Sequence, residues 1–202
     1  MRALITLSNA IKAVLEKLAF ASGWLLIVLM CITCTDILAR KLAGCVVCMD
    51  FLASKLGLTD PFPLTKFQEL EWHMHTAIFS LWMGYNYVIN AHPRVDSYTE
   101  TLKFRTKAWI EFVGCVLFAL PYTWLLVFHG WDFVWTSYVQ NERSENAVGL
   151  ENRWIIKAVF WFGLWLLLAG VLSVMLRLVA FLFGGRPQDE VELQIGHAEL
   201  EA

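Results

Sequence analysis

Four long stretches of the chain carry no charged side chain, and they determine the predicted architecture. Residues 18–35, 72–93, 112–131 and 158–176 lack Asp, Glu, Lys and Arg, and hold 18, 22, 20 and 19 residues. About 20 apolar residues in an α-helix span the roughly 30 Å hydrocarbon core of a bilayer. Backbone groups in lipid must be hydrogen-bonded within their own segment, so such runs form helices. The pattern predicts an all-α integral membrane protein with four transmembrane helices.

The residues between these stretches indicate where the predicted helices begin and end. Helices are predicted over about 18–39, 67–90, 108–130 and 154–183, which makes 18–183 the transmembrane domain. Apolar positions near helical spacing in 1–17, interrupted by two lysines, predict an interfacial helix at the N-terminus. A second short interfacial helix is expected in the connection after the first span, before the helix-breaking Asp60–Pro63. Residues 184–202 begin with a Gly-Gly-Arg-Pro stop and predict an acidic, flexible tail.

Composition agrees with a membrane protein and excludes one large class of partner. The chain is 58% hydrophobic and 17% charged, with a mean hydropathy of +0.55, whereas soluble domains carry about 25% charged residues. A net charge of −2 offers no basic field for nucleic acid. Lysine and arginine are slightly more numerous on the side that carries both termini. This bias predicts cytoplasmic N- and C-termini.

The sequence ELEWHMH, residues 69–75, concentrates two carboxylates and two imidazoles at the start of the second predicted span. Glu69 with His73, and Glu71 with His75, are spaced i,i+4. The two pairs lie about 200° apart around a helix, so they cannot converge on one metal. A di-iron bundle would also need a second Glu-x-x-His motif, and the chain has none. We therefore predict no metal and no cofactor here, but a charged helix start that meets a partner.

The cysteines suggest a different chemistry. Cys31 and Cys34, and Cys45 and Cys48, form two C-x-x-C pairs. The first pair lies within a predicted span, where cysteine is usually a small apolar residue. The second pair follows that span, as in quinone-linked thiol oxidases, which also have four helices. Such an enzyme needs another cysteine pair in the second external connection, and residues 131–153 contain none. A membrane thiol oxidoreductase using Cys45 and Cys48 remains the alternative.

Further charges and tryptophans gather at the ends of the predicted spans. The segment HPRVD ends the second span, RTKAWIE opens the third, and ENRWIIK opens the fourth. Boundary charges with too few internal partners point to a neighbouring chain. The candidate interface residues are Glu69, Glu71, Trp72, His73, His92, Arg94, Asp96, Arg105, Trp109, Arg153, Trp154 and Lys157.

These motifs, in this order, resemble the small permease subunit of tripartite ATP-independent periplasmic (TRAP) transporters, the DctQ type. The resemblance rests on ELEWH, H-x-R-V-D, R-x-x-A-W-I-E, F-A-L-P and G-L-x-x-R-W-x-I-K, and covers residues 69–183. The chain departs from the family pattern at Pro93 and Glu151.

The resemblance implies a non-enzymatic subunit in a bacterial inner membrane. Its expected partners are a large permease subunit, a periplasmic substrate-binding protein and membrane lipids. The large subunit would carry the organic-acid substrate and the coupling sodium, and this chain would serve as its scaffold. The sequence agrees with that division of roles, because no Asp, Glu, Lys or Arg lies in the middle of a predicted span.

Overall fold

The computed structural model describes residues 2–45, 48–49, 64–91, 101–146, 148–185, 187, 191 and 193. Within these residues all regular structure is helical and no strand occurs. The elements are α1 (Arg2–Gly23), α2 (Leu25–Ala43), α4 (Leu64–Val88), α5 (Phe104–Gly114), the π-helix η1 (Cys115–Ala119), α6 (Leu120–Val139) and α7 (Trp154–Gly184). The all-α class predicted from the sequence is confirmed for this part of the chain.

Among the described residues, three helices are long and apolar enough to cross a membrane. They are Arg2–Ala43, Phe104–Val139 and Trp154–Gly184. α4 also forms where the second span is predicted and has 25 residues. It is not among these three helices because its composition is too polar. Its first turns carry Lys66, Glu69, Glu71 and two histidines. Length and composition alone therefore support three spans.

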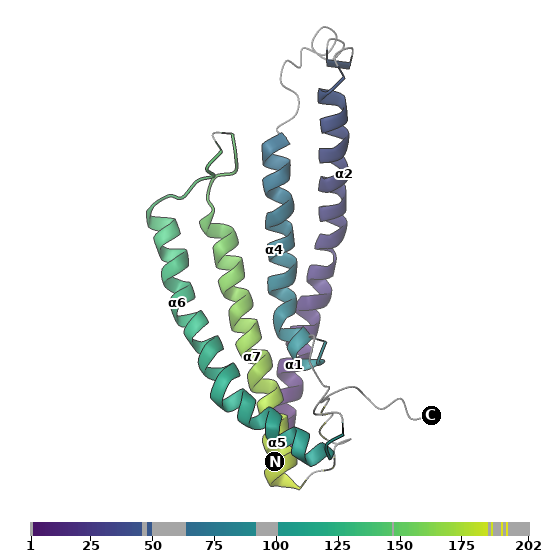
Figure 1. Ribbon diagram of the computed structural model, residues 1–202, viewed down its shortest axis with the longest axis vertical. Helices are drawn as coiled ribbons and strands as arrows, with labels where there is room; N and C mark the ends of the chain where they lie inside the picture. Colours follow the sequence, from purple (N-terminus) through teal and green to yellow (C-terminus); the bar gives the residue numbers. More distant parts are fainter. Residues whose placement is uncertain are drawn as a thin grey trace, which may run out of the picture.

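The helices form an elongated bundle with α4 and α7 at its centre (Figure 1). α1 and α2 lie end to end with a turn at Trp24, and α4 runs back beside both. α7 packs against α4, α1 and α6. α2 and α6 end, and α4 and α7 begin, at the top of Figure 1, which we call the upper end. α1 begins and α7 ends at the opposite, lower end.

Small residues bring the backbones of α4 and α7 into direct contact. A Cβ atom on Gly163 would lie 2.6 Å from the carbonyl oxygen of Ser80. A Cβ atom on Gly170 would lie 2.5 Å from the carbonyl oxygen of Gly84. Close approach over small residues is how helices gain van der Waals contact where lipid removes the hydrophobic driving force. These glycines therefore set the distance between the two central helices.

A π-helical turn interrupts the helix that runs from α5 into α6. The Leu120 N–H donates to the carbonyl of Cys115, five residues earlier. Pro121 follows directly; a proline inside a helix has no N–H and its ring crowds the carbonyl four residues before it. The wider turn relieves this crowding while keeping the helix continuous. The bend in Figure 1 between α5 and α6 lies here.

Several predicted boundaries differ from the observed ones. The third helix was expected to end near residue 130, but α6 continues to Val139 because nothing before Asn141 (φ 48°) breaks it. α1 also runs unbroken past residue 17, the predicted end of the interfacial helix, to Gly23. The predicted fourth helix, 154–183, is confirmed, since α7 covers Trp154–Gly184 and ends at Gly185, which has a left-handed conformation (φ 61°).

Two parts of the prediction fall largely or wholly outside the described residues. These are the Asp60–Pro63 break and the motif that contains His92, Arg94 and Asp96. In the predicted acidic tail, Val191 and Leu193 are buried in the same apolar cluster as Leu178 of α7. These two side chains are therefore not solvated.

Candidate functional site

Glu69, near the start of α4, is the most densely hydrogen-bonded carboxylate among the described residues. Its side chain is 6% exposed. The connection between α6 and α7 supplies its partners: Oε1 accepts from the Ser144 hydroxyl and from Asn146 Nδ2 (3.3 Å), and Oε2 accepts from the Leu150 backbone N–H (2.5 Å). Charge-assisted hydrogen bonds are the strong ones. The Glu69 carboxylate thus holds the connection between α6 and α7 against α4.

Arg153 extends this site to the first turn of α7. Its Nη2 lies 4.0 Å from Glu69 Oε1, and its guanidinium carbon lies 5.7 Å from the centre of the Trp72 ring. Trp72 in turn contacts the His73 ring at 4.0 Å between centroids. The His73 Nδ1 donates to the Glu69 carbonyl at 2.6 Å. Two motifs about 80 residues apart in the sequence thus form one site.

The backbone of the connection is shaped to receive the carboxylate. A Cβ atom on Gly149 would lie 2.6 Å from Glu69 Oε1 and would also overlap the Ser144 side chain. Only glycine allows that approach. The Ser144 N–H donates to the Leu150 carbonyl (3.1 Å), which closes the connection into a compact loop.

A second ion pair joins the same connection to α7. Glu142 accepts from Lys157 Nζ, and the ammonium also lies 4.1 Å from the centre of the Phe133 ring. The hydrogen bond from Lys157 is the main cause that lowers the pKa of the Glu142 carboxyl. Lys157 therefore does not reach the α4 carboxylates.

Glu71 lies on a different side of α4, toward α2. Its Oε1 is buried and has no hydrogen-bond partner among the described residues. The nearby cation is Arg40, whose Nε donates to Asp36 Oδ2 at 2.6 Å and whose Nη2 donates to Gln68 at 3.5 Å. The Asp36 Oδ1 is also buried without a partner in this part of the chain. Glu69 and Glu71 thus belong to two separate clusters of polar side chains, the Glu69 cluster at the α6–α7 connection and the Arg40 cluster at α2.

The remaining described candidates lie at opposite ends of the bundle. Trp154 packs edge-on against Tyr138 of α6, 5.4 Å between centroids, at the upper end. Trp109 packs against Phe183 at 5.5 Å, where α5 meets the last turns of α7 at the lower end. Arg105 is exposed on the first turn of α5. The structure therefore does not gather the candidate residues into one patch.

The five cysteines differ in bonding and exposure. Cys45 and Cys48 form a disulfide just beyond α2, at the upper end. Cys31 and Cys34 are free and exposed on α2, and Cys115 is a buried thiol 3.3 Å from the Tyr87 hydroxyl. The α6–α7 connection contains no cysteine that could exchange with the disulfide.

No group of three or more His, Cys, Asp or Glu residues in the described segments is placed to hold a metal ion. The Glu69 carboxylate has a structural role in this geometry, because the chain itself supplies the hydrogen-bond donors to both of its oxygens.

Comparisons with protein-family models, with curated proteins and with solved structures find no match.

Sequence reasoning missed the partners of Glu69. The four-span prediction puts the starts of the second and fourth helices, which carry Glu69 and Arg153, at the same membrane face, but it gives no role to Ser144, Asn146 or the Leu150 amide. The one available signal was Gly149 in a connection otherwise rich in polar residues, since a glycine often marks a close backbone approach.

Proposed function

We propose that this chain is the small membrane subunit of a TRAP transporter, a secondary transporter that takes organic acids from a periplasmic binding protein. It acts as a scaffold for the large permease subunit in a bacterial inner membrane and catalyses no reaction itself. Substrate and sodium bind to the large subunit. The observation that carries the proposal is the convergence of two of the resembling motifs, ELEWH and G-L-x-x-R-W-x-I-K, on the Glu69 site.

The Glu69 site suits a scaffold because it makes the upper end of the bundle a preformed surface. The connection is fastened to α4 through Glu69 and to α7 through Lys157. Its outward side chains Arg143, Glu145, Val148 and Glu151 are exposed. A surface fixed before binding loses little conformational entropy when a partner docks.

The outer faces of the bundle offer the partner and the lipid a large apolar surface. On α2 the side chains of Leu26, Met30 and Leu38 are more than half exposed, and on α6 so are those of Trp124 and Phe128. Exposed apolar surface of this extent marks lipid or protein contact. In the proposed complex, lipid and the large permease subunit cover these faces.

In this proposal α4 is the fourth span, despite its modest hydropathy. α1 and α2 cover one side of it and α7 another. No residue from Ser80 through Val88 is exposed. A helix shielded from lipid by its neighbours can carry serine, tyrosine and asparagine, because their polar groups face protein.

The orientation follows from the disulfide and the charges. Disulfides persist in the periplasm and not in the bacterial cytosol. In the proposed orientation the upper end, where Cys45 and Cys48 follow α2, faces the periplasm, and the lower end, where α1 begins and α7 ends, faces the cytoplasm. The small excess of Lys and Arg on the terminal side favours the same orientation.

Affinity purification from the native membrane tests the proposal. The chain is tagged, extracted gently, and its companions are identified by mass spectrometry. We expect one large polytopic permease at near one-to-one stoichiometry, and retention of this complex in the control variant Asp132→Asn, which alters an exposed carboxylate on α6. Absence of any permease under conditions that keep other inner-membrane complexes intact would overturn the proposal.

The bonded Cys45–Cys48 pair favours one second candidate, a membrane thiol oxidoreductase. That function requires a mixed disulfide with a soluble thiol protein. Cys48→Ser leaves Cys45 free to trap such a partner, whereas Cys115→Ser is the control because that thiol is buried. A trapped oxidoreductase without a permease would replace the transporter proposal, and a permease without trapping would exclude the enzyme.

A further inference from the structure

Side-chain contacts fix the height of α1 relative to α7. The Ser8 and Ser173 hydroxyl oxygens lie 2.8 Å apart. Further along α1, Gly84 of α4 lies between the Leu15 side chain and the backbone of Leu166. Seven residues separate the two contact points in both helices, 8 to 15 in α1 and 166 to 173 in α7, so the antiparallel helices keep one register. Leu15 and Leu166 therefore lie at the same level of the bundle.

This level is the middle of the apolar part of the bundle. The charge-free run of α7, residues 158–176, is centred on residue 167, one position from Leu166. The charge-free run in α4 and beyond it, residues 72–93, is centred between 82 and 83, within two residues of Gly84. A bilayer that covers these two runs evenly has its middle at the level of Leu15.

Two charged side chains of α1 occur at this middle level. Glu16 and Lys17 directly follow Leu15 and lie within about 3 Å of it along the helix axis, at 1.5 Å per residue. Both are exposed, and neither has an ion-pair or hydrogen-bond partner in the part of the chain that the structure describes. The headgroups are about 15 Å away, half of the roughly 30 Å core, which is too far for snorkelling. Charged groups at such a depth face protein or a water-filled cavity and are paired.

The apolar surface of α2 is displaced toward the upper end. The charge-free run 18–35 begins next to Lys17, at the middle level, and continues into α2, which extends beyond the upper ends of α6 and α7 (Figure 1). On α2, Ile37 and Leu38 are 53% and 63% exposed. A bilayer fitted to α4 and α7 would thus surround the charges of α1 and leave these apolar side chains outside its core. A protein partner along α1 and α2 removes both mismatches.

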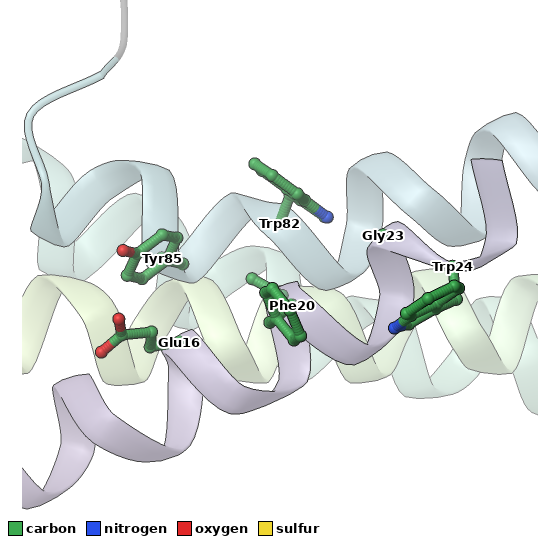
Figure 2. Close-up of a pocket in the computed structure, with 7 residues that line it drawn as sticks. Glu16, Phe20, Gly23, Trp24, Trp82 and Tyr85 are labelled. Atoms are coloured by element: carbon green, nitrogen blue, oxygen red, sulfur yellow. The ribbon is translucent and has the colours of Figure 1, made fainter. Parts of the chain in front are cut away.

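A groove beside Glu16 has the chemistry to receive a cationic side chain. It lies between α1 and α4, has a volume of about 330 Å³, and combines the Glu16 carboxylate with the rings of Phe20, Trp24, Trp82 and Tyr85. Figure 2 shows Glu16 across the groove from Tyr85. A carboxylate forms charge-assisted hydrogen bonds with an ammonium or guanidinium group, and aromatic faces attract the same cations. The volume equals that of about eleven water molecules at roughly 30 Å³ each, which gives room for one long side chain.

We infer that a transmembrane helix of a partner chain lies along this face of α1 and places a Lys or Arg side chain in the groove, where it pairs with Glu16. Ala13 and Ala21 are exposed one turn before and one turn after Lys17, so their small side chains allow the two helices to approach closely. The same helix keeps lipid away from Lys17. In the proposed complex this partner is the large permease subunit. That identity rests on the proposed function, whereas the covered face needs only a membrane location.

Photo-crosslinking in the native membrane tests which face is covered. p-Benzoylphenylalanine replaces Phe20 beside Glu16 or, in a separate chain, Phe128 on α6, and these two rings are 75% and 63% exposed. We expect the Phe20 probe to form an adduct with a co-purifying multi-pass protein, in higher yield than the Phe128 probe, because lipid can cover the charge-free face of α6. A yield at Phe20 no higher than at Phe128, or a Phe20 adduct with a second copy of this chain, would overturn the inference. If a permease co-purifies in that experiment, the transporter proposal still stands. A Phe20 adduct with a multi-pass protein other than a permease would support the inference and overturn the transporter proposal.

Variants of the full chain test the ion pair. Glu16→Gln should lower the amount of co-purified partner by about tenfold or more, because the cation of the partner is left buried and unpaired. Glu16→Asp keeps the charge and should retain most of the complex, and the control Asp132→Asn removes an exposed carboxylate from α6 and should retain all of it. The amount of the Glu16→Gln chain in the washed membrane should equal or exceed that of the wild type, since a charge at mid-depth is costly. Recovery of the partner at the wild-type level in Glu16→Gln, or a loss of that chain from the membrane, would contradict the pairing.

Discussion

Removing the Glu69 carboxylate should release the connection between α6 and α7 from the rest of the bundle. In Glu69→Ala, the Leu150 N–H loses its 2.5 Å acceptor and the Ser144 hydroxyl loses its partner. Each such bond to a charged group contributes about 1.5–3 kcal/mol. Asn146 at 3.3 Å and Arg153 at 4.0 Å add less, because both contacts are long.

The expected loss is about 3 kcal/mol in the free energy that holds the connection closed. Two short bonds give roughly 3–6 kcal/mol, and water entering the freed site recovers part of it. Amide hydrogen exchange measures this local opening directly. Since 1.36 kcal/mol corresponds to a factor of ten, the Leu150 amide should exchange more than about a hundredfold faster in Glu69→Ala.

Two further variants separate the carboxylate from other effects. Glu69→Gln keeps an acceptor oxygen but loses the charge, so the Leu150 amide should exchange about tenfold faster than in the wild type. Glu145→Ala removes an exposed carboxylate from the same connection and should leave exchange unchanged. Amides in the middle of α7 serve as the internal reference for global stability.

The reasoning is refuted if the Leu150 amide in Glu69→Ala exchanges within about threefold of the wild-type rate while α7 stays protected. That result would mean that the backbone of the connection holds itself closed. If α7 loses protection to the same degree, the carboxylate stabilises the whole bundle and not the connection. In that case the exchange of the Leu150 amide is compared in Glu69→Gln, because this milder change perturbs the rest of the bundle less.

Two other predictions concern packing and pH. Gly84→Ala places a Cβ atom against the Leu166 carbonyl and should destabilise the bundle by about 1–3 kcal/mol, measured by unfolding in detergent. The control Gly114→Ala should be neutral or slightly stabilising, because a Cβ atom there has nothing within 4 Å. Lys157 lowers the pKa of Glu142 below its usual 4.5, so this pair stabilises the fold above that pH and the stabilisation is lost as pH falls through the lowered pKa. Thermal unfolding between pH 7 and 3 should show a smaller loss in Glu142→Gln than in the wild type, because protonation of the other carboxylates contributes equally to both; an identical pH dependence in both would contradict the assignment.

The sequence predicted the helices well where charge patterning determines them. α7 was placed within one residue because Arg153 directly precedes its first apolar residues and a left-handed glycine ends it. The end of α6 was wrong by nine residues, because aromatic residues 131–138 are as compatible with a helix as with an interfacial connection. The π-helical turn was not predicted, since Pro121 alone allows a kink, a break or a wider turn.

The candidate site was only partly accessible from the sequence. Helical spacing placed Glu69 and His73 on one face and identified charged span ends. It could not assign Glu69 and Glu71 to different neighbours, because that depends on where α2 and the α6–α7 connection lie around α4. Apart from Gly149, no residue in the sequence signals the hydrogen bond that the Leu150 backbone N–H donates to Glu69. Contacts made by connections are decided by tertiary packing, not by periodicity.

The two clusters around α4 have opposite consequences for a partner. The Glu69 cluster satisfies its own carboxylate and so fixes a surface. The Arg40 cluster leaves Asp36 Oδ1 and Glu71 Oε1 buried without hydrogen bonds in the described segments. Arg40 itself is partly exposed, 46% of its side chain, and bonds Asp36 on its own helix and Gln68 on α4. A buried carboxylate oxygen without a donor costs about 1–3 kcal/mol or more. Because both oxygens are covered by the chain itself, a partner that docks at α2 reaches only the exposed guanidinium of Arg40, so we expect the proposed large subunit to contact this cluster through Arg40.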